Sequence, residues 1–450
     1  MVTVACLAAA LQPLLTTVAD AAARESGMIE RQGKVTGATF VQTLVFGWLG
    51  RPDASLSQLA QVAATCGLPI SPQGLDARFT AAAATCLKTV LAAAMRQVLA
   101  AAPVALPVLR RFTGVSVWDS TTVTLPDALA AVWPGCGGRV ATHTRAALKV
   151  QVRWELTTGA LELAEVQAGR ASDRAAADRA APLPAGALRL TDLGYVSLAR
   201  LSDLTAQGVF VLCRLPAHVA VFDGRGRRWT AAALLNRQGG ATVDLPVTLG
   251  VAERTPVRLV ARRVAPAVAA RRRRAWRTAA KREGRAVSRE RLALADWDAS
   301  ITTVPTAQLS ATEALTLVRA RWQVELLFKL WKSHGRIDEW RSGQPWRILC
   351  EVYAKLLAML IQHWCLLLRC WADPARSLVK AAAVVRQHAL ILATARGQQR
   401  RLQAALTTLR EALAAAGRLT TRRARPSTAH LLLALGAADP VPHQAECLAA

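Results

Sequence analysis

The sequence predicts a mixed α/β fold with helical regions at both ends. Apolar residues recur at helical spacing over the first 110 residues and again beyond residue 305, whereas residues 111–218 alternate between strand and helix patterns. The expected elements of this middle region are a strand at 115–125, a hairpin at 148–169, a helix at 172–181, a strand ending at Asp192, a helix at 196–208 and a strand at 209–215. Such an order favours one sheet covered by helices, with reactive polar groups at strand ends.

The charge of the chain points to a polyanionic partner. Among 450 residues, 57 Lys and Arg oppose 30 Asp and Glu, which gives a net charge of +27. A hydrophobic fraction of 52% allows large cores and two to four domains, and excludes a disordered protein. Nucleic acid is therefore the expected partner.

The cysteines and apolar runs indicate a reduced protein outside the membrane. The nine cysteines form no C-x-x-C pair, so we expect free thiols in the cytoplasm and no zinc site. The apolar N-terminus lacks a preceding basic residue, which argues against a secretion signal. Lys355, Gln362, His363 and Arg369 interrupt the apolar run at 353–372, as in a buried or amphipathic helix.

The region 1–110 is expected to be helical and allows two interpretations. Ser55 can cap a short helix that ends at Gly67, and a second helix is expected from about Pro72 to Leu99. Two helices around a Gly/Pro turn suit a helix-turn-helix DNA binder and a plain helical bundle equally well.

Residues 219–304 are predicted to form an antiparallel, all-β insertion rich in basic residues. Between Arg254 and Arg291 the net charge is +12. A solvated charge run is one interpretation. The clustering of basic residues beside an aromatic favours a DNA-binding segment that follows phosphates and stacks on a base. The residues assigned to it are Arg271, Arg272, Arg273, Arg274 and Trp276.

The stretch at 321–332, RWQVELLFKLWK, is predicted to be a helix opened by Ser310 or Thr312. On a regular helix Arg321, Glu325, Lys329 and Lys332 share a narrow stripe. The spacing also fits an ordinary ladder of surface ion pairs. Because the stripe is thin, we expect it to line a cleft, where a carboxylate between cations is a candidate metal ligand.

Three acids stand out as one candidate site: Asp119 inside a strand, Asp192 at a strand end and Glu325 on this helix. Divalent cations prefer such oxygen ligands, and a pair of them about 4 Å apart can hold both oxygens of a phosphoryl displacement. Spacing alone makes this a weak signal.

The chain resembles the DDE transposases of the insertion sequence 4 group, whose signature is Y-x2-R-x3-E-x6-K. Arg321, Glu325 and Lys332 match three of its positions, while Val318 stands at the Tyr position. VWDSTTV around Asp119 and TDLGYVSL around Asp192 also resemble the family's acidic blocks. The resemblance runs from about Thr36 to Leu368.

The resemblance implies a ribonuclease H-like catalytic core at 111–218 and 305–372 and a helical N-terminal region at 1–110. Beyond it, a second basic patch at 396–425 with eight Arg predicts a C-terminal helical region at 373–450 for dimerisation or DNA contact. It implies that Asp119, Asp192 and Glu325 bind two Mg²⁺ ions, for which Mn²⁺ can substitute, and that Arg321 and Lys332 hold phosphates. The implied partners are the inverted repeats of the transposon, target double-stranded DNA and a second copy of the chain, in the bacterial cytoplasm at the nucleoid. Trp276 and Trp297 are candidates for stacking a flipped base.

Two other functions remain open. A decayed or domesticated DNA-binding relative would retain the basic surfaces without catalysis, and Val318 lacks the hydroxyl that the signature Tyr offers to a phosphate. A ribonuclease H-like repair nuclease would cut DNA without joining it, but the long basic insertion makes this alternative weaker.

Overall fold

A computed structural model describes residues 1–438 except 32, 138–144, 193, 194, 196, 217, 218, 283, 374, 396, 397, 416 and 419–427. The chain divides into two compact units. The first unit comprises Met1–Ala105, Asp119–Ala176 and Val324–Thr420, and the second comprises Leu106–Trp118, Ala177–Gln323 and Thr421–Ala450.

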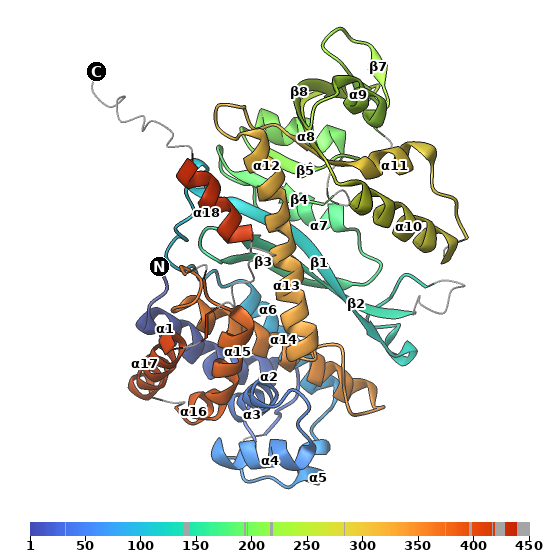
Figure 1. Ribbon diagram of the computed structural model, residues 1–450. Coiled ribbons are helices and arrows are strands. Elements are labelled where there is room, and N and C mark those ends of the chain that lie inside the picture. The colour runs from blue at the N-terminus through green and yellow to red at the C-terminus, as the bar shows by residue number, and fades with distance from the viewer. Residues whose placement is uncertain are drawn as a thin grey trace. The chain divides into compact units, whose positions relative to one another are not determined.

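The first unit is built around the long helix α14 (Pro345–Leu367), whose residues from Ile348 onward are all buried. It packs against α3, α6 and α15, and Figure 1 shows α15, α16 and α17 beside the N-terminal helices. The other helices of this unit are α1 (Val4–Leu14), α2 (Thr17–Glu25), α3 (Gly37–Gly50), α4 (Leu56–Thr65), α5 (Pro72–Asp76), α6 (Ala81–Met95), α15 (Leu378–Gln387), α16 (Ala389–Thr394) and α17 (Gln399–Ala415).

Capping side chains set the starts of the N-terminal helices. Ser55 accepts a hydrogen bond from the amide of Gln58, which confirms the predicted cap of α4. The single helix predicted from Pro72 to Leu99 is wrong. Thr80 caps a new helix there, so α5 ends at Asp76 and α6 begins at Ala81.

The first unit also contains one end of the sheet, in the order β3–β2–β1. β2 (Ala146–Glu155) and β3 (Leu161–Ala168) form the predicted antiparallel hairpin, and β1 (Val115–Leu125) is the predicted strand around Asp119. His363 of α14 lies 2.8 Å from the carbonyl oxygen of Gly159 in the hairpin turn. The helix α7 (Asp173–Arg179) follows β3.

In the second unit the sheet continues from β1 in the order β1–β4–β5–β10–β9–β8–β6–β7. β4 pairs with β1 and β5 in parallel, and the strands from β10 onward pair antiparallel. Buried Val, Leu and Ile side chains of these strands form its core. The strands are β4 (Leu188–Thr191), β5 (Phe210–Arg214), β6 (Val221–Phe222), β7 (Arg228–Trp229), β8 (Thr242–Leu249), β9 (Thr255–Arg263) and β10 (Trp297–Thr302).

The region 219–304 contains the predicted antiparallel strands but is not all-β. Three helices belong to it: α9 (Ala231–Gln238), α10 (Pro266–Arg282) and α11 (Arg289–Ala293), with α9, α10 and α11 visible beside the strands in Figure 1. Thr230 caps α9, and α10 begins at a proline and consists mainly of Ala and Arg, which are strong helix formers. Local helix propensity therefore overrides the alternating pattern at these segments.

The second unit also contains η1 (Pro107–Arg111), α8 (Leu198–Ala206), α12 (Ala311–Leu317) and α18 (Thr428–Ala438). Of these, α12 leads directly into the signature stretch. Ser310 caps α12 through a reciprocal pair of hydrogen bonds with Glu313, which confirms one of the two predicted caps. Gly194, residues 396, 397, 416 and 419–425 of the basic run at 396–425, and the last residues of the predicted C-terminal region lie outside the described residues.

Two helical stretches, Val4–Glu25 and Pro345–Leu367, have the length and apolar character of a membrane span. The apolar window of the second stretch, which is α14, is completely buried inside the protein, as expected for a helix of the protein core. The eight described cysteines are free thiols, as predicted.

Candidate active site

Asp119 and Asp192 each come directly after the last paired residue of two neighbouring parallel strands, β1 and β4. The register of β1 and β4 ends at the pair Trp118 and Thr191. Asp119 continues β1, and the backbone amide of Ser120 donates a 2.8 Å hydrogen bond to its Oδ1. Asp192 stands at the carboxyl end of β4, where α/β folds place reactive groups.

A buried cation supports the end of β4 within the second unit. The guanidinium group of Arg189 stacks 4.6 Å from the ring centre of Trp118 and donates to the carbonyl oxygen of Tyr195. The amide of Tyr195 in turn donates to the carbonyl oxygen of Asp192. Burial, followed by the negative charge of Asp192, raises the pKa of Cys213 to about 12, so this neighbouring thiol stays protonated.

The signature stretch is helical but not a regular helix. It begins as a 3₁₀ turn, η5 (Val318–Arg321), continues as α13 (Trp322–Lys329) and ends as a π-helical segment, η6 (Leu330–His334). A π turn holds more residues per turn than an α turn, so Lys332 is rotated away from the stripe predicted on a regular helix. The predicted single stripe is therefore wrong in its last turn.

Burial distinguishes the signature residues from their neighbours on this stretch. Arg321, Glu325 and Lys332 are half-buried, whereas Lys329 is exposed. Leu326, which a regular helix would place on the apolar side, is 45% exposed. The structure thus places the three matching residues in a more enclosed environment than the lysine that only completes an ion-pair ladder.

A direct hydrogen bond connects this stretch to the strand of Asp119. The Nζ atom of Lys332 donates to the carbonyl oxygen of Thr122 at 2.8 Å, and both residues belong to the first unit. Thr122 lies three residues beyond Asp119 on β1. In the second unit, η5 with Arg321 packs against β4 and β5.

Close to Asp119, the structure shows a fourth acid that the sequence analysis missed. Asp173, the first residue of α7, accepts hydrogen bonds from Lys149, Gln151 and the hydroxyl of Ser120. The only sequence signal was its position at a predicted helix start, which by itself indicates a cap. Because Asp173 is paired with Lys149 at 3.0 Å, it fixes β1, β2 and α7 together.

The basic helix α10 has two different faces. Arg272 donates to the carbonyl oxygen of Trp297, and Arg273 donates to the carbonyl oxygen of Leu292 and pairs with Asp296. The opposite face is exposed and cationic, and consists of Arg271, Arg274, Arg277, Lys281 and Arg282. Two of the four consecutive arginines predicted to contact DNA therefore also hold the helix in place.

The two tryptophans considered for base stacking differ in exposure. Trp276 is half-buried, with the guanidinium of Arg291 5.3 Å from its ring centre. Trp297 is only 3% exposed and donates a hydrogen bond to Asn236. The structure therefore places Trp297 in the core, as a packed aromatic side chain.

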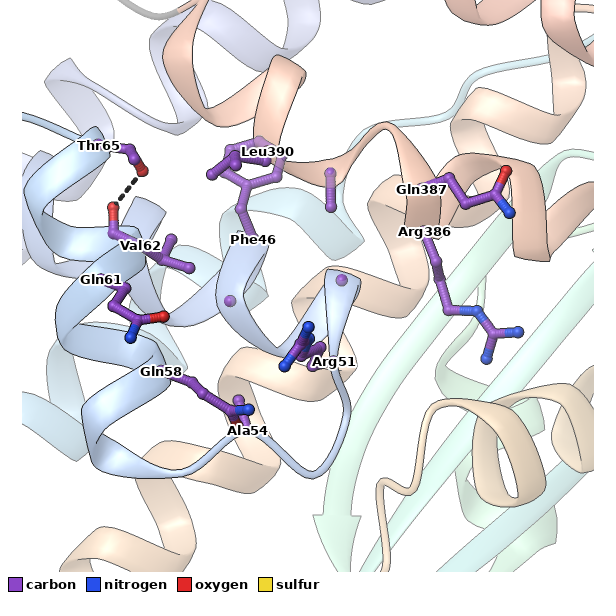
Figure 2. A pocket seen from close by; sticks show the side chains of 13 residues that line it. Phe46, Arg51, Ala54, Gln58, Gln61, Val62, Thr65, Arg386, Gln387 and Leu390 are labelled. Carbon is purple, nitrogen blue, oxygen red and sulfur yellow. Dashed lines mark hydrogen bonds between the residues drawn. The ribbon is translucent and has the colours of Figure 1, made fainter.

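A cavity of about 300 Å³ lies among the helices of the first unit, away from the residues of the candidate site. Figure 2 shows Phe46 of α3, Gln58 and Gln61 of α4, and Arg386 of α15 among its lining residues. Arg386 also donates to the carbonyl oxygen of His334, at the end of η6. Within the described part of the chain, no three His, Cys, Asp or Glu side chains are grouped closely enough to hold a metal ion.

Residues 110–361 match the family described as Transposase DDE domain. This range is more than half of the chain and contains Asp119, Asp192, Glu325 and Lys332. The fold and the matched range define the class: the chain belongs to the DDE transposase domain family.

Full-length relatives extend the similarity beyond this domain. The transposase for insertion sequence element IS231C from Bacillus thuringiensis subsp. berliner is 26% identical over 371 residues, which cover 77% of this chain and 77% of the relative. That for IS231F from subsp. israelensis is 26% identical over 362 residues, 75% of each chain. That for IS1151 from Clostridium perfringens is 23% identical over 364 residues, 75% of this chain and 76% of the relative.

Proposed function

We propose that this chain is the transposase of a bacterial insertion sequence. It cuts the DNA at the transposon ends and joins the freed 3′-OH to target DNA in a cut-and-paste reaction. Its membership of the DDE transposase domain family supports this proposal, as does its similarity to insertion-sequence transposases over three quarters of their length. The proposed location is the bacterial cytoplasm, where chromosomal DNA is accessible.

The observation that carries the proposal is the position of the acids on the sheet. Asp119 and Asp192 follow directly on the last register pair of two neighbouring parallel strands, and Lys332 from the signature stretch is bonded to the strand of Asp119. Two acids on adjacent parallel strands and a third on a following helix suit a ribonuclease H-like core, which we assign to 111–218 and 305–372.

The donor set fits hard divalent cations. Asp119, Asp192 and Glu325 offer only carboxylate oxygens, which Mg²⁺ prefers and Mn²⁺ accepts. We assign these three residues as the ligands that would hold two ions. When bound, the ions would polarise the scissile phosphate and stabilise the attacking and leaving oxygens.

The chain's own cations position the DNA in this reaction. Arg321 and Lys332 are half-buried, flank Glu325 in sequence and bind the phosphates on either side of the scissile bond. Water attacks the phosphorus at the transposon end, breaking the bond to the 3′ oxygen and leaving a 3′-OH. That hydroxyl then attacks a target phosphodiester, forming a new P–O bond and releasing a target 3′-OH.

DNA outside the reacting phosphate is held by basic surfaces. We assign the exposed face of α10, with Arg271 and Arg274, to backbone phosphates and Trp276 to an adjacent base. Arg272 and Arg273, on the packed side of the helix, add to the positive electrostatic potential that attracts these phosphates. The helical regions 1–110 and 373–450 are proposed to bind transposon ends and to support a homodimer that pairs two ends.

The test is strand cleavage of DNA that carries the flanks of the element's own gene, with Mg²⁺. Asp119→Ala and Glu325→Gln should each abolish cleavage and joining while end binding in a gel-shift assay stays within about threefold of the wild type. Asp203→Asn, at an exposed acid of α8, serves as the acid control and should retain cleavage. Cleavage at the wild-type rate by either active-site variant would overturn the assignment. Metal-independent binding without any product would instead favour a decayed DNA-binding relative.

A further inference from the structure

The buried side chain of Lys355 on α14 is saturated with hydrogen bonds. Its Nζ atom lies 2.8 Å from Oε1 of Glu351, one turn earlier on the same helix, and donates to the carbonyl oxygens of Arg336 and Glu339 at 3.1 and 2.7 Å. Three acceptors match the three N–H donors of an ammonium group. Lys355 is 2% exposed and Glu351 3%, so water does not compete for these bonds.

The two carbonyl groups belong to the turn that ends the signature stretch. The amide of Gly335 donates to the carbonyl oxygen of Leu330, closing the π turn, and Arg336 follows with a positive φ of 48°. A side chain on Gly335 would meet the Sδ atom of Met359 and the carbonyl oxygen of Trp331. This turn therefore has one tightly defined path against α14.

Holding a turn with a buried ion pair costs free energy, because both charges are removed from water. Burial lowers the pKa of Lys355, because it disfavours the charged form, and the carboxylate of Glu351 opposes this effect. Replacing such pairs by apolar side chains is often neutral or stabilising. In some proteins such pairs instead fix one conformation. The segment bonded here is the turn that follows η6, and η6 carries Lys332.

We propose that Lys355 is a positioning residue for DNA cleavage: it anchors the turn after η6 and thereby holds Lys332 against β1. The path runs from Glu351 and Lys355 through the carbonyl of Arg336 to η6, and from Lys332 to Thr122. Arg386 assists by binding the carbonyl oxygen of His334. All of these residues lie within the first unit. The inference rests on the proposed function for its catalytic consequence.

The test uses the double variant Glu351→Gln/Lys355→Met, which removes both charges without leaving one of them unpaired. The first readout needs no DNA: hydrogen exchange of the amides at 330–339 should accelerate at least tenfold, while the melting temperature identifies any global loss of fold. The control Arg376→Met removes another cation of the first unit, paired with Asp373 and bonded to the carbonyl oxygen of Leu413. It should leave exchange at 330–339 unchanged.

The second readout is the single-turnover rate of end cleavage at saturating protein. We expect a fall of about 10- to 100-fold in the double variant, the size of effect that a misplaced group produces, with end binding unchanged. In a Lys332→Met background the same double change should cost less than about twofold, because the group being positioned is already gone.

The outcomes separate this inference from the proposed function. Unchanged exchange at 330–339, or an equal fall in rate with and without Lys332, would overturn the positioning role. A wild-type protein that binds ends but does not cleave would refute the proposed function, while accelerated exchange in the double variant would still support the anchoring of Lys332.

Discussion

The side chain of Lys332 donates a 2.8 Å hydrogen bond to the backbone carbonyl oxygen of Thr122, three residues beyond Asp119 on β1. One of the three matched signature residues is thus fixed to the strand that carries an acid of the candidate site. A lysine in this position can bind a phosphate with its remaining donors while its location is set by the protein backbone.

Replacing Lys332 should therefore impair cleavage more than replacing its neighbour. We expect Lys332→Ala to lower the single-turnover cleavage rate about 100-fold, the cost of removing one preorganised electrostatic interaction. Lys329→Ala, on the same stretch but exposed, should change it less than twofold. Equal decreases in the two variants would mean that the helix contributes only general positive charge.

Replacing Val318 by tyrosine should increase activity. Val318 opens η5 and is half-buried, and its side chain offers no hydroxyl to a phosphate. A hydrogen bond to a charged group is worth about 1.5 to 3 kcal/mol, so Val318→Tyr should raise the cleavage rate about 10- to 100-fold. Val318→Phe supplies the ring without the hydroxyl and should not. If both variants gain equally, packing rather than phosphate binding explains the effect.

The two faces of α10 should separate DNA affinity from stability. Arg271→Ser/Arg274→Ser should weaken DNA binding and reduce the slope of log K against log salt by about 0.9 for each phosphate that the variant no longer binds. The melting temperature should stay the same. Arg272→Ser/Arg273→Ser removes the bonds to Asp298 and Asp296 and should lower the melting temperature. Identical salt slopes in wild type and the first variant would exclude the exposed face as a DNA-binding surface.

The ion pair between Arg111 and Glu313 should make stability dependent on acid pH. Burial alone would raise the pKa of Glu313, but hydrogen bonds from Arg111 and Ser310 outweigh it, so the pKa lies below its ordinary value of 4.5. The stabilisation is present above that value and is lost as pH falls through the lowered pKa. Glu313→Gln should therefore cost about 2 kcal/mol of unfolding free energy at pH 7 and much less at pH 3. Urea unfolding of both proteins at the two pH values measures this, and a pH-independent difference would contradict it.

Local signals in the sequence were sufficient for much of this fold. Serine caps, β-branched alternation and the hairpin turn predicted α4, α12, β1, β2 and β3, because each depends on residues close together in the chain. The acids of the candidate site were predicted from their strand and helix contexts and from a family signature. The register of β1 with β4 could not be predicted, because it depends on pairing between residues about 70 positions apart in the chain.

Other features depend on tertiary contacts and were beyond sequence reasoning. The alternating stretches and the basic run at 219–304 concealed the helices α9, α10 and α11. The different roles of the two faces of α10 depend on Asp296 and Asp298, which lie more than 20 residues away. The π-helical turn at Leu330–His334 also has no local signature. It is defined by the bonds that Lys332, Lys355 and Arg386 make to other segments.

Because of the π turn at Leu330–His334, we expect the activity to depend strictly on the number of residues between Glu325 and Lys332. The six residues between Glu325 and Lys332 comprise the end of α13 and the first two residues of η6, so the interval sets a helical phase as well as a distance. Deleting one residue from α13 ahead of the π turn would turn every later side chain by about 100° around the helix axis. Insertions and deletions at 326–331 should consequently be far more damaging than most substitutions there, even those that keep Glu325 and Lys332 themselves intact.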